Sequence, residues 1–209
     1  MALKSTKEIT TPIVNIGKPS YASYGEFDND NFQVFTPQFI VRDMIKAVGG
    51  KIIFDYHYTI LEPTSGDGAF VGRILEGRLK KYIKGSKTYL ADSVRSISTI
   101  YSIEMDKDLV EKQRNNVFSV FMKYAQKAGV ERDQELIGLA KEIISKNIIW
   151  GMTNSGNPIT PLAPEVAYKM PEAEKGNLIS LEFPVWDIGD DLKYKLHYEE
   201  CELWVKTTR

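Results

Sequence analysis

Short apolar runs alternate along the chain with longer stretches in which apolar residues recur at helical spacing. Four stretches have this helical spacing: residues 37–48, 70–84, 107–128 and 133–146. Three short runs have the composition of strands: residues 58–61, 99–103 and 147–150. Strands that alternate with helices are typical of a parallel sheet covered by helices, so the pattern predicts an α/β fold.

Capping residues mark the ends of the predicted helices. Thr36 followed by Pro37 is a typical helix start, with the threonine as N-cap and the proline in the first turn, where its missing N–H is not needed. Asp106 is placed to cap the third helix, and Gly129 is placed to end it. The helix limits are therefore predicted by two independent features, spacing and caps.

The two ends of the chain differ from its middle. Residues 1–31 are polar, with scattered glycines and prolines, and we expect them to form an N-terminal arm. Residues 32–152 hold the predicted helices and strands. Residues 153–209 are a loop-rich C-terminal segment, which we expect to form a small β appendage.

Within the C-terminal segment, residues 153–176 read as a loop or linker rich in proline and asparagine. Residues 178–183 predict one more strand. Apolar and polar residues alternate from Leu192 to Val205, which predicts a hairpin, with a helix as the alternative.

The composition excludes several classes of protein. The 209 residues include 27 Lys and Arg against 28 Asp and Glu, so a net charge of −1 excludes a wholly basic nucleic-acid-coating protein but leaves room for a local basic face. The single cysteine, Cys201, excludes a disulfide scaffold and a thiolate zinc cluster. No apolar run approaches the roughly 18 residues that span a membrane, and the first residues lack a signal-peptide core. We therefore expect a cytoplasmic protein with no membrane partner.

The turn after the first predicted strand is the first candidate site. In the segment 62–70, Gly66 and Gly68 permit a tight turn and close approach of a ligand, and the helix that follows offers unpaired N–H groups. Glu62 and Asp67 would repel a pyrophosphate but suit a cationic or hydroxyl-bearing ligand. The spacing also misses the dinucleotide G-x-G-x-x-G pattern. Taken alone, the turn is more simply explained as a chain reversal.

The acid at the end of the second predicted strand strengthens this candidate. Glu104 would stand next to the turn in a parallel sheet, where a carboxylate accepts both hydroxyls of a ribose. Met105 could then lie against an adenine face. The alternative is that Glu104 is a helix-start carboxylate that interacts with the helix dipole. Together, the turn and the acid indicate a nucleoside ligand, with that alternative left open.

The order of three motifs resembles one enzyme family. Phe35-Thr36-Pro37, then Leu61 to Phe70, then Ile100 to Asp106 are similar to motifs of the S-adenosylmethionine-dependent adenine-specific DNA methyltransferases of restriction–modification systems. The resemblance covers residues 32–152. It implies a Rossmann-like methyltransferase sheet flanked by helices.

The resemblance also implies a binding site for S-adenosyl-L-methionine. Its motifs contain these candidate residues: Thr36, Glu62, Pro63, Ser65, Gly66, Asp67, Gly68, Phe70, Glu104 and Met105. The methionine part of the cofactor is expected to be surrounded by Glu62, Ser65, Gly66 and Gly68. Thr36 would contact the methionine carboxylate, and Asp67 would lie near the amino group. Glu104 would bind the ribose hydroxyls, with Met105 on the adenine.

Two departures from the family separate this chain from a complete enzyme. Met152 stands where the family has an acid that binds the adenine amine. The catalytic Asn/Asp-Pro-Pro-Tyr/Phe tetrapeptide does not occur, and its nearest counterparts are the segments 157–160 and 183–187. Fewer than 60 residues follow Gly151, which is short for a domain that reads a DNA sequence. The catalytic residues are therefore unassigned.

Two functions follow as expectations. The first is an S-adenosylmethionine-binding DNA adenine-N6 methyltransferase, or the cofactor-binding part of one, which reaches DNA through a partner or a local basic face. The second is a catalytically silent methyltransferase-like binding protein, either a subunit completed by a protein partner that supplies the catalytic or target-recognition part, or a decoy of a restriction–modification system. A methyltransferase for protein or small-molecule substrates stays open as a third option.

The remaining polar candidates favour simpler explanations. His57 and His197 have no metal-ligand spacing and are expected to be packed or surface residues. The basic run 78–87, which contains Tyr82, is favoured as a solvated helix face over a phosphate-binding site.

Overall fold

The structure is a computed structural model that describes residues 35–83, 88–154, 166–169 and 182–200. Its elements, in chain order, are α1 (Gln38–Val48), α2 (Gly50–Ile53), β1 (Ile60–Glu62), α3 (Ala69–Ile83), α4 (Tyr89–Ser98), β2 (Ile100–Glu104), α5 (Lys107–Ala128), α6 (Gln134–Asn147), β3 (Ile148–Asn154), β4 (Val166–Lys169), β5 (Glu182–Ile188) and β6 (Tyr194–Glu200). The N-terminal arm expected for residues 1–31 lies outside the described residues. No helix in the described ranges is long and apolar enough to cross a membrane.

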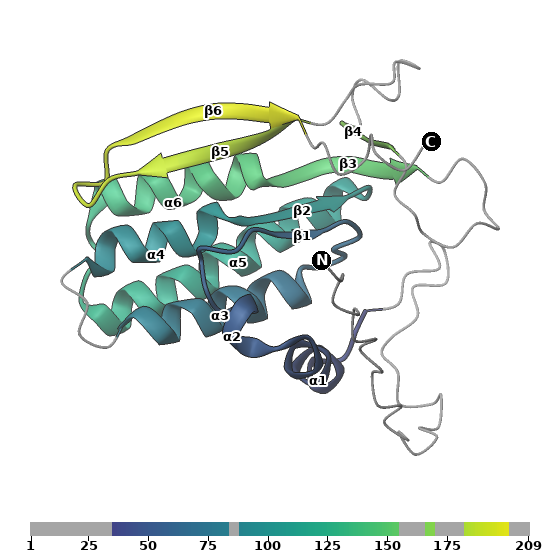
Figure 1. The fold of residues 1–209 in the computed structure, drawn as a ribbon, viewed down its shortest axis with the longest axis horizontal. Coiled ribbons are helices and arrows are strands. Elements are labelled where there is room, and N and C mark those ends of the chain that lie inside the picture. Colours follow the sequence, from purple (N-terminus) through teal and green to yellow (C-terminus); the bar gives the residue numbers. More distant parts are fainter. Residues whose placement is uncertain (1–34, 84–87, 155–165, 170–181, 201–209) are drawn as a thin grey trace, which may run out of the picture.

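The main sheet has the strand order β1-β2-β3-β4 (Figure 1). The first three strands are parallel, with Ile60 opposite Ile100 and Ile103 opposite Ile149, and β4 is antiparallel to β3. A separate antiparallel hairpin is formed by β5 and β6. The chain therefore has a mixed α/β fold in which three parallel strands are flanked by helices, as predicted.

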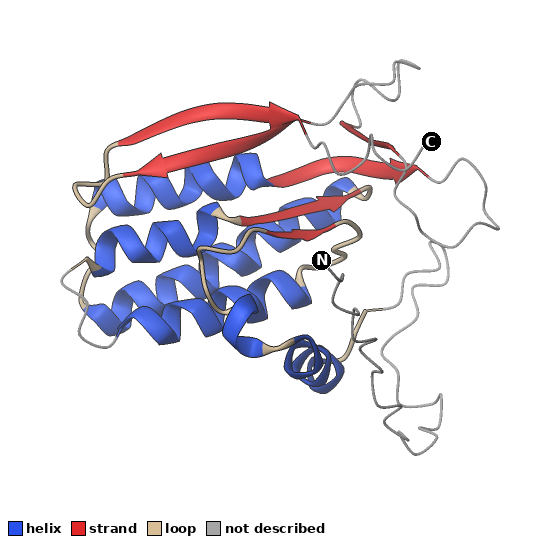
Figure 2. Cartoon of the chain, in the orientation of Figure 1, coloured by secondary structure: helices blue, strands red, loops and turns tan. Residues whose placement is uncertain are grey.

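Each step between parallel strands passes through two helices. The pair α3 and α4 joins β1 to β2, and the pair α5 and α6 joins β2 to β3 (Figure 2). Because α3 follows β1 and α5 follows β2, the amino ends of these two helices lie at the carboxyl edge of the sheet. This edge is where ligands bind in open parallel sheets.

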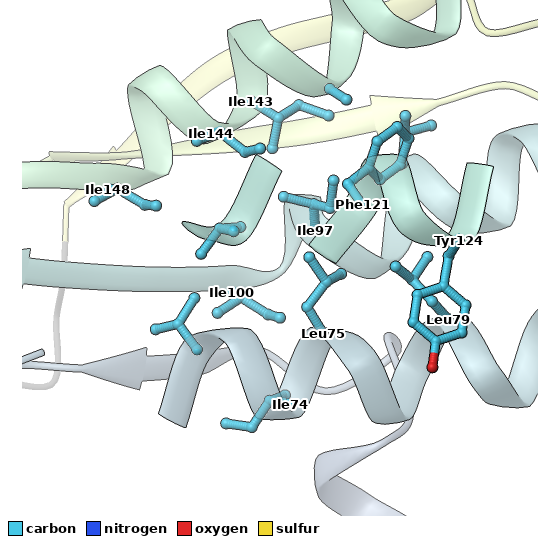
Figure 3. Packing of buried hydrophobic residues seen from close by; sticks show 14 of the residues in the cluster. Ile74, Leu75, Leu79, Ile97, Ile100, Phe121, Tyr124, Ile143, Ile144 and Ile148 are labelled. Atoms are coloured by element: carbon cyan, nitrogen blue, oxygen red, sulfur yellow. The ribbon is translucent and has the colours of Figure 1, made fainter. Parts of the chain in front are cut away.

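The main core lies between the helices and one face of the sheet. Figure 3 shows Leu75, Ile97 and Phe121, which come from three different helices and belong to one buried cluster. On β2, alternate side chains face opposite ways. Ile100 joins this core, whereas Ile103 joins a smaller cluster that includes Phe183 of the hairpin. The hairpin contributes to both clusters, because Phe183 packs in the smaller one whereas Trp186 and Ile188 belong to the main core.

Helix α4 is absent from the predicted order of elements. Its sequence is rich in serine, yet Ser93 and Ser96 are buried. Their hydroxyls donate to the carbonyls of Leu90 and Asp92, each at 2.7 Å. Because the helix backbone accepts hydrogen bonds from these hydroxyls, serines can occupy buried positions of α4. Apolar residues therefore mark only part of the buried face of α4 in the sequence.

The third strand extends further than expected. It was predicted to end at Trp150, but β3 continues to Asn154 because residues 151–154 pair with β4. The loop expected for 153–176 is therefore wrong at the two segments that pair, 153–154 and 166–169. Within the alternation at 192–205, residues Tyr194–Glu200 form β6, and the strand that completes the hairpin is β5 at Glu182–Ile188. The strand expected at 178–183 overlaps β5 only at residues 182–183, and residues 178–181 and 201–205 lie outside the described residues.

Candidate functional site

The turn between β1 and α3 depends on its two glycines. Gly66 has φ +54° and Gly68 has φ +82°, a region that other residues rarely adopt. A Cβ added at Gly68 would lie 2.4 Å from Gln113 Cγ, so helix α5 also excludes a side chain there. The Ser65 N–H donates to the Ile103 carbonyl at 3.1 Å, which attaches the turn to the end of β2.

Glu104 joins this turn to the neighbouring strand end. Its Oε2 accepts from the Gly66 N–H at 2.8 Å, and its Oε1 accepts from the Asp106 N–H at 2.9 Å. Each carboxylate oxygen has a second lone pair, so both can still accept a ligand hydroxyl. The helix-start role falls to Asp106, whose side chain accepts from the N–H groups of Asp108 and Leu109. The sequence prediction that Asp106 caps this helix is confirmed.

A buried glutamine on α5 forms hydrogen bonds that hold the turn in place. Gln113 is fully buried; it accepts from Ser65 Oγ at 2.8 Å and donates to Ser102 Oγ at 2.9 Å. Sequence reasoning missed this residue. It occupies a position in the apolar stripe of α5, between Val110 and Val117, and a polar residue at such a position was the available sign.

Glu62 is a carboxyl group without a cationic partner among the described residues. It ends β1, and burial raises its pKa, although a hydrogen bond from the Thr64 backbone acts in the opposite direction. A positively charged ligand group would offset the unfavourable burial of this charge. The site therefore favours a cation near Glu62.

Asp67 already faces a cation. Its Oδ2 lies 4.0 Å from Lys112 Nζ, and its carbonyl accepts from Asn116 at 3.3 Å. The Lys112 ammonium also lies 5.0 Å from the centre of the Phe35 ring. An ammonium group of a ligand would therefore compete with Lys112 for Asp67.

The segment before α1 lies against the glycine turn. Phe35 Cδ1 is 4.0 Å from the position of a Cβ at Gly66. The expectation that Thr36 caps α1 is wrong, because Pro37 occupies the N-cap position and no side-chain cap forms. Thr36 is half-buried and adjacent to this contact, so the structure brings the first two motifs together.

The other predicted site residues differ in their surroundings. Pro63 is half-buried in the turn, and Phe70, in the first turn of α3, packs against the main core. Met105 is 60% exposed at the end of β2, and its carbonyl accepts from Trp150 Nε1. The side chain of Met152 lies outside the described set. The structure thus places Met105, but not Phe70, at the surface.

A cavity of about 360 Å³ lies behind the turn, between α3 and α5. Residues that line it include Gln38, Asp67, Gly68, Arg73, Asn116 and Lys123. Neither Glu62 nor Glu104 borders it. This cavity is therefore separate from Glu62 and Glu104, which lie at the ends of β1 and β2.

The described counterpart of the missing catalytic tetrapeptide, residues 183–187 in β5, does not form an open site. Segment 157–160 lies outside the described residues. In β5, the Pro184 carbonyl accepts from the Tyr101 hydroxyl at 2.6 Å, and Trp186 Nε1 donates to Asn147 Oδ1 at 2.8 Å. Trp186 is buried, so it is not available to stack on a base. This part of the 183–187 segment attaches the hairpin to β2 and to the end of α6.

His57 and the described part of the basic run, residues 78–83, lie at the opposite end of the strands. Arg78 is fully buried, and Lys81 Nζ lies 2.8 Å from Asp55 Oδ2. Asp55 also lies 2.7 Å from His57 Nδ1. The described part of the run therefore makes contacts within the protein.

Comparison with known proteins gives no family. No protein-family model matches the chain, and neither a curated protein nor a solved structure matches it.

Proposed function

We propose that the chain binds S-adenosyl-L-methionine at the carboxyl edge of β1 and β2, and that it is a DNA adenine-N6 methyltransferase or the cofactor-binding part of one, with a Rossmann-like methyltransferase fold. The observation that carries this proposal is the 2.8 Å hydrogen bond from the Gly66 N–H to Glu104. It places a glycine turn beside an acid on the next strand, at the strand ends where open α/β sheets bind nucleotides.

The chemistry of the site fits this cofactor. The sulfonium and the ammonium of S-adenosylmethionine are positive, and Glu62 and Asp67 border the turn. Glu104 has free acceptor capacity for a ribose diol, and exposed Met105 offers a polarizable surface to the adenine. The bound cofactor would supply an electrophilic methyl group, and these residues would hold it in one orientation.

The methyl acceptor is the exocyclic amine of adenine in DNA. The Asn-Pro-Pro-Tyr tetrapeptide does not occur in this sequence, so we propose that the part that holds the flipped base comes from a further polypeptide segment, for example that of a partner protein. DNA is reached through that partner or through a local basic face, in the cytoplasm.

Calorimetric titration with S-adenosylmethionine and its demethylated product tests the first step. Wild type should bind both, and Glu104→Gln should weaken binding about 10- to 100-fold, because it removes a charged acceptor. Glu142→Gln is the matched control, since Glu142 Oε2 accepts only from the exposed Tyr194 hydroxyl in the described structure. Absence of binding by the wild type would overturn the proposal.

The second candidate function is a silent binding protein, and the packing of Trp186 in β5 favours it. Incubation of the chain with labelled cofactor and DNA separates the two. Transfer by the chain alone excludes the silent form, and transfer only with a second polypeptide indicates a split enzyme. Cofactor binding without transfer under either condition supports the decoy.

A further inference from the structure

We infer that Trp150 is a positioning residue for Glu104, because its indole N–H fixes the peptide group that holds this carboxylate. The inference rests on the proposed function for its consequence, since Glu104 is there the ribose-binding acid. Its geometric part stands on described contacts alone.

Trp150 is the neighbour of Glu104 across the sheet. The two residues are paired in the register of β2 and β3, so both side chains lie on the same face. The indole packs partly against the main core, and the Lys107 ammonium lies 5.3 Å from its ring centre. The ring is thereby held next to the start of α5.

One peptide group connects the indole to the carboxylate. Trp150 Nε1 donates to the Met105 carbonyl at 3.0 Å, and the Asp106 N–H donates to Glu104 Oε1 at 2.9 Å. The carbonyl of Met105 and the N–H of Asp106 belong to the same planar peptide group. When the indole fixes the carbonyl, it also fixes the direction of the N–H.

The connection continues to the glycine turn. The second oxygen of Glu104 accepts from the Gly66 N–H. A rotation of the 105–106 peptide would therefore change how Glu104 meets both the turn and a ligand. Trp150 acts through this peptide and needs no contact of its own with the reacting atoms.

This role differs from stabilisation of the fold. Met105 is 60% exposed, so water reaches the peptide and can replace the indole N–H. Trp186 offers the contrast, because its Nε1 donates to Asn147 Oδ1 in a buried setting. The same change, tryptophan to phenylalanine, should thus affect orientation at position 150 and stability at position 186.

Hydrogen exchange tests the geometric part without a ligand. In Trp150→Phe, the Asp106 amide should exchange about tenfold faster while the unfolding midpoint stays close to that of the wild type. In Trp186→Phe, the midpoint should fall, with no selective change at Asp106. Unchanged protection of the Asp106 amide in Trp150→Phe would overturn the inference.

Competition by adenosine and 2′-deoxyadenosine tests the consequence for binding. Wild type should prefer adenosine, and Trp150→Phe should reduce that preference about three- to tenfold, whereas Trp186→Phe should keep it. Glu104→Gln should remove the preference, and adding Trp150→Phe should lower it no further, since both act on one contact. An unchanged preference in Trp150→Phe overturns the inference. A wild type that binds no nucleoside overturns the proposed function instead, and hydrogen exchange then still decides the role of Trp150.

Discussion

The two ends of the parallel strands use their polar side chains differently. At the amino end, the guanidinium of Arg78 is fully buried and donates only to groups of the protein. Its acceptors are the carbonyls of Ile53, Tyr58 and Ser96 and the hydroxyl of Thr99. These groups lie next to β1, β2 and α4, so one side chain holds the start of the sheet together.

At the carboxyl end of the strands, the polar side chains keep hydrogen-bonding capacity or charge that the described residues do not satisfy. Glu104 is fixed by two N–H groups and has acceptor capacity left, and Glu62 has no cationic partner among the described residues. The comparison teaches how to distinguish the two roles. A polar side chain whose partners all belong to the protein serves folding, whereas a fixed carboxylate with free acceptor capacity at a strand end is suited to a ligand.

Removal of the Arg78 side chain should give the largest loss in the free energy of unfolding. Burial lowers the pKa of Arg78 to about 10, so the side chain remains charged at neutral pH. Arg78→Met should lower the free energy of unfolding by about 3–5 kcal/mol, because it leaves buried carbonyls without donors. Urea unfolding measures the loss.

Arg114 provides the matched control for this prediction. It also donates to two carbonyls, those of Ser145 and Ile148, but its side chain is partly exposed. Arg114→Met should therefore lower the free energy of unfolding by only about 1 kcal/mol, since water replaces the lost donors. Equal losses in the two variants would show that the burial of Arg78 does not decide how much its carbonyl contacts stabilise the amino end of the strands.

Substitution of a turn glycine should act on both folding and binding. Gly68→Ala combines backbone strain at φ +82° with the 2.4 Å contact to Gln113, and should lower the free energy of unfolding by about 2–4 kcal/mol. Cofactor affinity should fall as well, because Gln113 also holds Ser65.

Gly129→Ala is the control that separates backbone strain from the steric contact present at Gly68. Gly129 has φ +73°, and nothing lies within 4 Å of an added Cβ. It should lose only about 1–2 kcal/mol, from backbone strain, and keep full cofactor affinity in calorimetry. Weaker cofactor binding in Gly129→Ala would show that stability alone controls affinity.

A helix was predictable from the sequence where the spacing of its apolar residues and its capping residues indicate the same limits. Helix α5 begins after Asp106 and ends at Gly129, as predicted from both features. Helix α4 was missed because buried serines that bond to their own helix resemble surface residues in a sequence. Strand β4 was missed because its pairing with β3 bridges residues that are distant in the chain.

The site residues also differ in whether a local sequence pattern marks them. Gly66 and Glu104 were recognised because a glycine turn and a strand-end acid have a local pattern, and the structure brings them to 2.8 Å. Gln113 and Trp150 were not recognised as parts of the site. Their roles depend on contacts across the sheet and between helices, which a local pattern does not contain.

A smaller effect, of opposite sign for folding and binding, is expected at Glu62. Burial raises its pKa, so between the usual carboxyl pKa and the raised value the folded chain binds more protons than the unfolded chain. Its contribution to stability therefore rises as the pH falls through this window. Glu62→Gln should be more stable than wild type at neutral pH, lose that advantage in acid, and bind the cationic cofactor about three- to tenfold more weakly.

Glu76 should show the opposite pH dependence. Burial raises its pKa, but hydrogen bonds from Arg73 and Lys80 outweigh burial and lower the pKa to about 2. Its contribution is present above the usual carboxyl pKa and is lost as the pH falls toward 2, so Glu76→Gln should be less stable than wild type at neutral pH. Thermal unfolding of both variants between pH 3 and 7 measures the two slopes. If Glu62→Gln were destabilised at neutral pH like Glu76→Gln, Glu62 would serve the fold, and the carboxyl edge would lose the uncompensated charge that favours a cationic ligand.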